Sequence, residues 1–172
     1  SGTTYGFSPF DFVQNPTLWL ETISKYSATT SSAPNFAYEY CLRPGKIPEI
    51  NMQSIDLKSL NFLMTAAEPV DPTIYEAFLK RFKPNGLKPD IFYSAYGLAE
   101  FTLAVTSRGN TRHKFSTDAL KKHEVVPVPL DHPECDSTTL MSCGILLGDA
   151  ELKIVEIGHN KKEASEGQVG EI

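Results

Sequence analysis

The sequence has little cysteine, no long apolar run and no cluster of positive charge. Its three cysteines, Cys41, Cys135 and Cys143, are too few and too scattered for a disulfide framework or a zinc site. No apolar run approaches the roughly 20 residues that cross a bilayer, and the first residues lack the basic start and apolar core of a secretory signal. A net charge of -5 argues against a nucleic-acid backbone as partner. We therefore expect a cytoplasmic protein with no membrane span.

What the sequence does contain is typical of a globular domain. The chain has 172 residues, of which 41% are hydrophobic and 22% charged, so one domain with a sizeable core is expected. Residues 168–172 read as the start of a strand rather than a tail, which suggests a piece of a longer protein.

Two short apolar runs flank the clearest helix pattern in the sequence. Residues 61–65 and 90–93 are expected to be buried strands, and Asp71 caps a helix that ends at residues 84–86. A strand–helix–strand unit crosses over right-handedly, so its strands run parallel and end at the same edge of the sheet. Open α/β sheets bind ligands at that edge.

We predict an α/β fold, with a mostly parallel sheet flanked by helices and a small antiparallel, β-rich C-terminal part. Residues 1–106 form the α/β part, in which residues 1–14 are irregular and a helix covers residues 34–42. Residues 107–137 are the least regular segment, and residues 138–172 begin the small β subdomain, with short strands at 139–143, 151–156 and 168–172.

Two loops at strand ends have the composition of a nucleotide site. Small residues let a ligand approach the backbone, an aromatic ring can stack on a base, and a carboxylate can hold a metal ion. The first loop contains Ala66, Ala67, Glu68 and Pro69, and the second contains Ser94, Ala95, Tyr96, Gly97, Leu98, Ala99 and Glu100.

Each of these features has an ordinary alternative. A glutamate such as Glu100 is favoured near a helix start by the helix dipole. Tyr96 is equally consistent with a core tyrosine, and Glu68 with a loop carboxylate. The aromatic-rich helix that begins near Asn35, Phe36 and Ala37 can line an apolar tunnel or pack in a core. Cys143 has no base nearby in the sequence, so a nucleophilic thiol is not expected.

Taken together, these segments resemble the adenylate-forming (AMP-binding) superfamily, and within it the fatty acyl-AMP ligases. Residues 8–39 are similar to the acyl-pocket region of these ligases, and residues 66–70 to their alanine-glutamate-proline adenine loop. Residues 96–100 are similar to the Tyr-Gly-x-Thr-Glu motif of the superfamily. The order and spacing of the motifs cover nearly the whole chain.

The resemblance implies roles for individual residues. Tyr96 would pack against adenine, Ala66 to Glu68 would line the base, and Glu100 would bind magnesium beside the α-phosphate. Asn35, Phe36 and Ala37 would face the acyl chain. Ala99 stands where the wider superfamily has a phosphate-contacting threonine, and fatty acyl-AMP ligases commonly have alanine there. Residues 107–137 fall where these ligases carry an insertion thought to disfavour coenzyme A ligation.

By this resemblance the parent enzyme would use ATP and Mg²⁺ to convert a fatty acid to an acyl-adenylate. It would then pass the acyl group to an acyl carrier protein, as in lipid or polyketide assembly. The phosphate loop and the catalytic lysine of the superfamily are missing, so we expect a fragment of the large N-terminal domain that is inactive alone. The alternatives are an acyl-CoA ligase, a non-catalytic adenylation-like binding module, and an unrelated α/β interaction domain.

Overall fold

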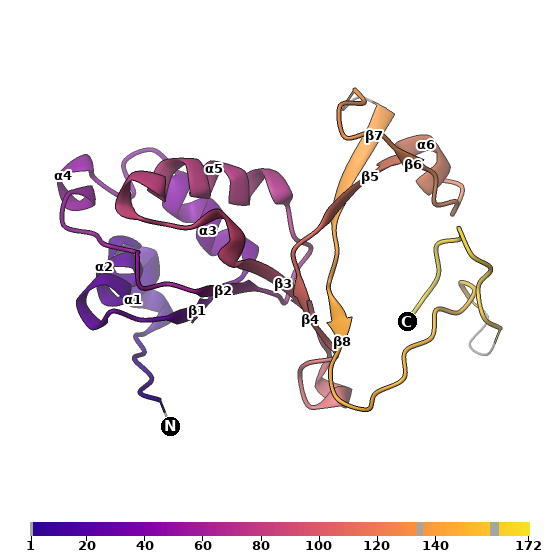
Figure 1. Ribbon diagram of the computed structural model, residues 1–172, viewed down its shortest axis with the longest axis horizontal. Helices are drawn as coiled ribbons and strands as arrows, with labels where there is room; N and C mark the ends of the chain where they lie inside the picture. The colour runs from indigo at the N-terminus through magenta and orange to yellow at the C-terminus, as the bar shows by residue number, and fades with distance from the viewer. Residues whose placement is uncertain (1, 134–135, 159–161) are drawn as a thin grey trace. The chain divides into compact units, whose positions relative to one another are not determined.

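The computed structural model describes residues 2–133, 136–158 and 162–172, and the path of the chain is traced in Figure 1. Cys135 and His159 lie outside the described residues. The internal contacts of the chain divide it into two units, residues 1–93 and residues 94–172. The three-part division expected from the sequence was drawn on motif content and stays a prediction.

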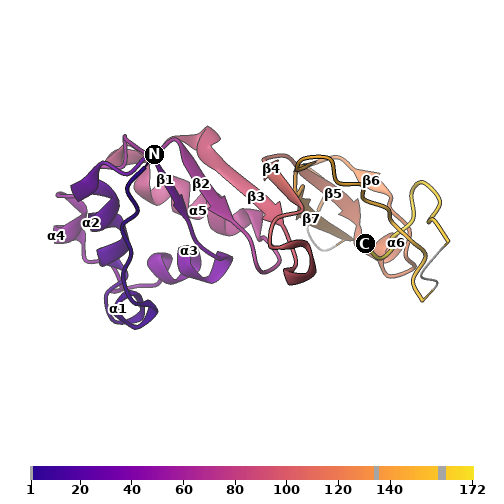
Figure 2. The ribbon, with the colours of Figure 1, turned by 90° about the horizontal axis from the view of Figure 1, so that it is seen from below.

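The first unit packs helices against short strands. Strand β1 pairs in parallel with β2, and β3, which begins in this unit, is next to β2 in the strand order. The arrows of β1, β2 and β3 run in the same direction (Figure 2). The helices and strands are α1 (Pro9–Gln14), α2 (Thr17–Tyr26), β1 (Thr30–Ser32), α3 (Asn35–Leu42), α4 (Glu49–Met52), β2 (Phe62–Thr65), α5 (Pro72–Phe82) and β3 (Phe92–Tyr96), with 3-10 turns at Lys83–Asn85 and Pro89–Ile91.

Helix α5 forms where the sequence predicts it. The carboxylate of Asp71 accepts a hydrogen bond from the backbone N–H of Thr73 at 2.8 Å, and Pro72 occupies the first helical position. The buried stripe contains Tyr75, Phe78 and Phe82. The local cap and the helical spacing of the apolar residues both favour a helix, and the tertiary packing of α5 is consistent with them.

Helix α1 contradicts the expectation that residues 1–14 are irregular. The Ser8 hydroxyl accepts a hydrogen bond from the backbone N–H of Phe10 at 3.1 Å, and Pro9 takes the first helical position. Ser8-Pro9 therefore starts a helix rather than a turn. Phe12 is the residue of α1 that is buried, against Trp19 and Tyr40.

Aromatic rings form much of the core of the first unit. The Tyr38 ring of α3 is fully buried, with centroids 5.3 Å from Trp19, 4.9 Å from Tyr75 and 5.2 Å from Phe78. These edge-to-face contacts link α2, α3 and α5. The core alternative for the aromatic helix is therefore correct for Tyr38.

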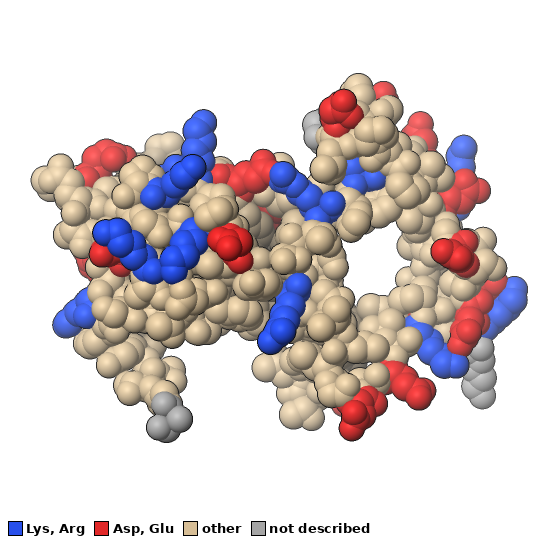
Figure 3. Space-filling view, viewed as in Figure 1, with Lys and Arg blue, Asp and Glu red and all other residues tan. Residues whose placement is uncertain are grey.

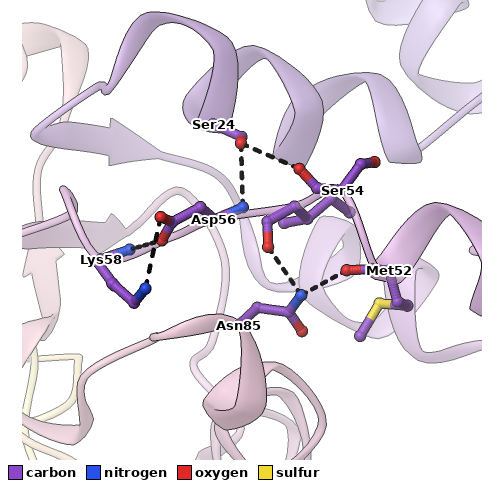
Figure 4. Close-up of polar contacts among 7 residues, drawn as sticks. Ser24, Met52, Ser54, Asp56, Lys58 and Asn85 are labelled. Carbon is purple, nitrogen blue, oxygen red and sulfur yellow. Dashed lines mark hydrogen bonds and ion pairs between the residues drawn. The ribbon is translucent and has the colours of Figure 1, made fainter.

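The chain between α4 and β2 is held by side-chain hydrogen bonds (Figure 4). The Asn85 amide donates to the carbonyl oxygens of Met52 at 2.7 Å and Ile55 at 2.9 Å. The Ser24 hydroxyl of α2 accepts from the backbone N–H of Asp56 at 3.0 Å. These bonds satisfy backbone groups that no helix or strand pairs.

The second unit is built from antiparallel strands. The end of β3 pairs with β4 and β4 pairs with β8, while β5 lies between β6 and β7 in a separate sheet. The sheet that contains β3 is thus mixed, as the α/β prediction with an antiparallel C-terminal part requires. The elements are a 3-10 turn (Ala99–Phe101), β4 (Thr106–Gly109), β5 (Arg112–Ser116), α6 (Thr117–Leu120), β6 (Pro127–Val128), β7 (Ser137–Met141) and β8 (Ile145–Leu146).

Two expectations for the second unit need correction. Residues 107–137, expected to be the least regular, carry most of a three-stranded sheet. The predicted strands at 151–156 and 168–172 are reduced to isolated bridges, such as Val155 to Glu171. An isolated bridge joins one residue pair only, whereas the sequence pattern predicted strands with several successive hydrogen-bonded pairs.

The charged side chains of each unit are mixed in sign on the face shown in Figure 3. None of the helices in the described part of the chain combines the length and the apolar character that crossing a membrane requires.

Candidate functional site

The first candidate loop leaves the C-terminal end of β2. Thr65 is buried, Ala66 is half-buried, and Ala67, Glu68 and Pro69 are exposed. Ala67 has a φ of 77°, in the left-handed region that a residue with a Cβ rarely adopts. The backbone therefore turns sharply at Ala67 and presents the loop to solvent.

The structure ties this loop to the start of α3. The Glu68 carboxylate accepts a hydrogen bond from the backbone N–H of Phe36 at 2.7 Å. Three residues further on, the backbone N–H of Asp71 donates to the side-chain oxygen of Asn35 at 3.1 Å. Glu68 is thus brought together with Phe36, and Asn35 with Asp71 at the end of the same connection. Sequence reasoning missed this connection.

Only one of the three acyl-pocket candidates is open to a ligand. Asn35 is 9% exposed and Ala37 4%, whereas Phe36 is 49% exposed. The Tyr38 hydroxyl donates to the Met64 carbonyl of β2 at 3.1 Å, which fixes the inward face of α3. Phe36 is therefore the one of these three candidates whose side chain is exposed, whereas Asn35 bonds to the backbone at Asp71.

In the second unit, the motif begins inside β3 rather than after it. Ser94 is almost fully buried, and its hydroxyl lies at the carbonyl oxygens of Gly109 and Ser142. The half-buried Tyr96 donates its backbone N–H to the Thr106 hydroxyl at 3.3 Å. These bonds hold β3 to β4 and to the chain just after β7, so Ser94 has a structural role, while Tyr96 remains half-buried.

Gly97 follows at a point of close backbone approach. A Cβ at this position would overlap the carbonyl oxygen of Leu103. Thr102 and Leu103 both have positive φ, at 64° and 147°. The motif needs glycine here because the chain folds back on itself within a few residues.

Glu100 lies in the 3-10 turn after this glycine, and it is exposed together with Ala99. No group of three or more metal-ligating side chains occurs among the residues that the structure describes. A lone exposed carboxylate still suits Mg²⁺, which keeps several waters and binds one or two carboxylates plus substrate phosphates. The exposure of Glu100 is compatible with such an ion, and magnesium binding at this residue stays a prediction.

Leu98 borders a hollow of about 530 Å³ in the second unit. Apolar side chains such as Phe101, Val105 and Leu152 line it, together with the charged residues Glu151, Lys153 and Glu171. The hollow adjoins the motif but does not contain Tyr96 or Glu100.

The described thiols are poor nucleophiles. Burial raises the pKa of Cys41 to about 12 and also raises the pKa of Cys143. With raised pKa values, both thiols remain protonated at neutral pH. They are poor nucleophiles because the thiolate is the reactive form. The two candidate loops themselves lie in different units, and their proximity across the sheet stays a prediction.

Comparison with known proteins gives concordant matches. The model of a family described as "AMP-binding enzyme" matches residues 1–172. A medium-chain-fatty-acid–[acyl-carrier-protein] ligase of Moorena producens, JamA, is 36% identical over 98% of this chain and 28% of its own length. A putative fatty-acid–CoA ligase of Mycobacterium bovis, fadD21, is 37% identical over 60% of this chain and 18% of its own.

A solved structure is similar over the same span. The fatty acyl-adenylate ligase of L. pneumophila, in complex with acyl adenylate and pyrophosphate, superposes with a TM-score of 0.82 and 37% identity. The match covers 95% of this chain and 28% of that one. The chain thus spans between a sixth and a third of the length of these proteins.

Proposed function

The chain belongs to the AMP-binding enzyme family, and from that membership we propose that it is part of a fatty acyl-AMP ligase. The parent enzyme would activate a fatty acid with ATP and pass the acyl group to an acyl carrier protein, in the cytoplasm. The observation that carries the proposal is that 98% of this chain matches an acyl-carrier-protein ligase and 95% of it matches a fatty acyl-adenylate ligase.

We assign the nucleotide to the two loops. The small residues Ala66 and Ala67 would let adenine approach the backbone, and the partly open ring of Tyr96 would pack on its face. Gly97, Leu98 and Ala99 would shape the turn beside the phosphates. A magnesium ion held by Glu100 would neutralise charge on the phosphate oxygens.

The reaction needs two displacements. A fatty carboxylate oxygen bonds to the α-phosphorus of ATP while the bridging bond to the β-phosphate breaks, so pyrophosphate leaves. A carrier-protein thiolate then attacks the acyl carbon, and AMP leaves. The residues of this chain would orient the reactants: Phe36 would contact the acyl chain and Tyr96 would place the base.

A charge-removing substitution tests the assignment of Glu100. In the full-length enzyme, Glu100→Gln should lower the rate of fatty-acid-dependent ATP–pyrophosphate exchange about 100-fold, in line with the loss of one preorganised electrostatic contact. Glu166→Gln, at another exposed carboxylate of the second unit, is the control and should leave the rate unchanged. Exchange by Glu100→Gln at the wild-type rate would reject the assignment.

An acyl-CoA ligase is the second candidate, favoured by the similarity to the fatty-acid–CoA ligase fadD21. Supplying coenzyme A in place of the carrier protein separates the two proposed functions. An acyl-CoA ligase forms the thioester on coenzyme A, whereas a fatty acyl-AMP ligase forms it on the carrier-protein thiol. Efficient acyl-CoA formation by the full-length enzyme would replace the carrier-protein proposal.

A further inference from the structure

Two hydrogen bonds clamp the candidate adenine loop to the first turn of the candidate acyl helix. Glu68 accepts from the backbone N–H of Phe36 at 2.7 Å, and Asn35 accepts from the backbone N–H of Asp71 at 3.1 Å. Glu68 lies in the loop, Asp71 caps α5 directly after it, and Asn35 and Phe36 are adjacent in α3. The segment from Glu68 to Asp71 therefore cannot move away from α3 without breaking both bonds.

Glu68 supplies a cap that α3 lacks locally. Pro34 stands at the N-cap position without a side-chain hydrogen bond, and the first turn of α3 contains no acidic residue. The open N–H groups of a helix start, and its positive dipole end, favour a carboxylate. Glu68 provides one from 32 residues away in sequence.

This contact changes the role expected of the Glu68 carboxylate. The resemblance implies that Glu68 lines the base, but the structure commits one of its carboxylate oxygens to the backbone N–H of Phe36. Phe36 is also the exposed acyl-pocket candidate. Glu68 thus connects the residue expected to meet the acyl chain with the loop expected to meet the base.

We propose that Glu68 is a positioning residue that couples fatty-acid binding at α3 to nucleotide binding at the 66–69 loop. This inference rests on the proposed function. An acyl chain packed on the Phe36 side chain would stabilise the first turn of α3, and with it the bond from the Phe36 N–H to the Glu68 carboxylate. That bond in turn supports the turn at Ala67, whose left-handed φ of 77° needs support from its surroundings. Loop order acquired in this way lowers the entropy that nucleotide binding must remove, and linkage makes the effect reciprocal.

Calorimetry on the full-length enzyme measures the coupling directly. The Kd of a non-hydrolysable α,β-methylene ATP analogue is measured with and without saturating dodecanoate, and the ratio of the two values is the coupling factor. We expect a wild-type factor of about 5, the lower end for coupled sites because the Glu68 bond is exposed. Glu68→Ala should bring the factor to about 1, and Glu68→Gln, which keeps an acceptor oxygen, should retain part of it.

The control removes a carboxylate of the same unit from a different place. Glu49→Gln, on α4, should keep the wild-type factor, because the Glu49 side chain is exposed and its ion pair with Arg81 is far from ideal at 3.8 Å. A thermal melt of each variant confirms folding. If Glu68→Ala does not fold, Glu68→Gln replaces it as the test variant, with a coupling factor expected between those of the wild type and an uncoupled enzyme.

Two results would overturn the inference. The wild type can show no coupling, or Glu68→Ala can keep the full factor. If Glu68→Ala keeps the factor but weakens analogue binding equally with and without dodecanoate, Glu68 is a direct nucleotide contact. Failure of the proposed function looks different, since the wild type would then neither bind the analogue nor support fatty-acid-dependent pyrophosphate exchange.

Discussion

At the scale of single residues, two buried tyrosines of the first unit differ in one respect. Tyr38 donates its hydroxyl to the Met64 carbonyl, whereas the Tyr75 hydroxyl lies by that of Thr65 but forms no hydrogen bond of normal geometry among the described residues. Burial raises the pKa of both, to about 12 for Tyr75, so both hydroxyls are neutral at physiological pH. A hydroxyl buried without a partner carries a desolvation cost that a bonded one offsets.

The pair predicts opposite outcomes for one chemical change. Tyr38→Phe should lower the free energy of unfolding by about 1 kcal/mol, since Met64 keeps its bond from Ala33 and only one bond is lost. Tyr75→Phe should leave the free energy unchanged or raise it by up to about 1 kcal/mol. Urea denaturation of the two variants and the wild type checks this. A larger loss for Tyr75→Phe would mean that its hydroxyl is satisfied.

At the scale of elements, side chains outside the helices and strands decide how the connections run. The amide of Asn85 donates two hydrogen bonds to carbonyl groups of the chain between α4 and β2 (Figure 4). In the same stretch, Lys58 forms an ion pair with Asp56 at 3.7 Å in which both side chains are largely exposed. The first contact should matter far more than the second.

Asn85→Ala should lower the free energy of unfolding by about 2 kcal/mol, because two partly buried bonds to backbone carbonyls are lost. Lys58→Ala should change it by less than about 0.5 kcal/mol, the usual scale for exposed ion pairs. Equilibrium denaturation in urea compares them. Equal effects would show that the stretch is held by its backbone conformation rather than by Asn85.

The elements also separate what the sequence could predict from what it could not. Helix α5 was predictable because its cap, its proline and its apolar stripe are all local. Strand β1, Thr30–Ser32, was missed because it is polar and exists through pairing with β2, a contact that its own residues do not signal.

The candidate site divides in the same way. Its motif residues could be found because their identities and order resemble a known family. The bond from Phe36 to Glu68 could not, because it joins residues 32 apart through a loop whose turn depends on a left-handed alanine. The proline at the N-cap of α3 was the one available signal, since it leaves the helix start in need of an outside acceptor.

At the scale of the whole molecule, the two units bury very different amounts of apolar side chain. The hydrophobic core cluster lies wholly within residues 12–91. Among the described residues of the second unit, Val105 is the one large apolar side chain that is buried, while Leu103 is 75% exposed and Ile145 is 64% exposed. Burial of apolar area is the main source of stability, so the first unit should resist local opening more strongly.

Native-state amide hydrogen exchange should therefore separate the units. Amides in α3 and α5 should exchange at least about tenfold more slowly than those in β5 and β7, which corresponds to a difference of about 1.4 kcal/mol in opening free energy. Mass spectrometry of peptides from residues 36–42, 75–82, 112–116 and 137–141 measures this. Because β7 is an edge strand, the comparison uses the slowest-exchanging amides of each segment, which are those bonded within a helix or across the β5–β7 ladder, so that unequal rates report opening rather than missing bonds. Equal rates would mean that the antiparallel sheet opens only with the aromatic core, and that burial within each unit does not govern its stability.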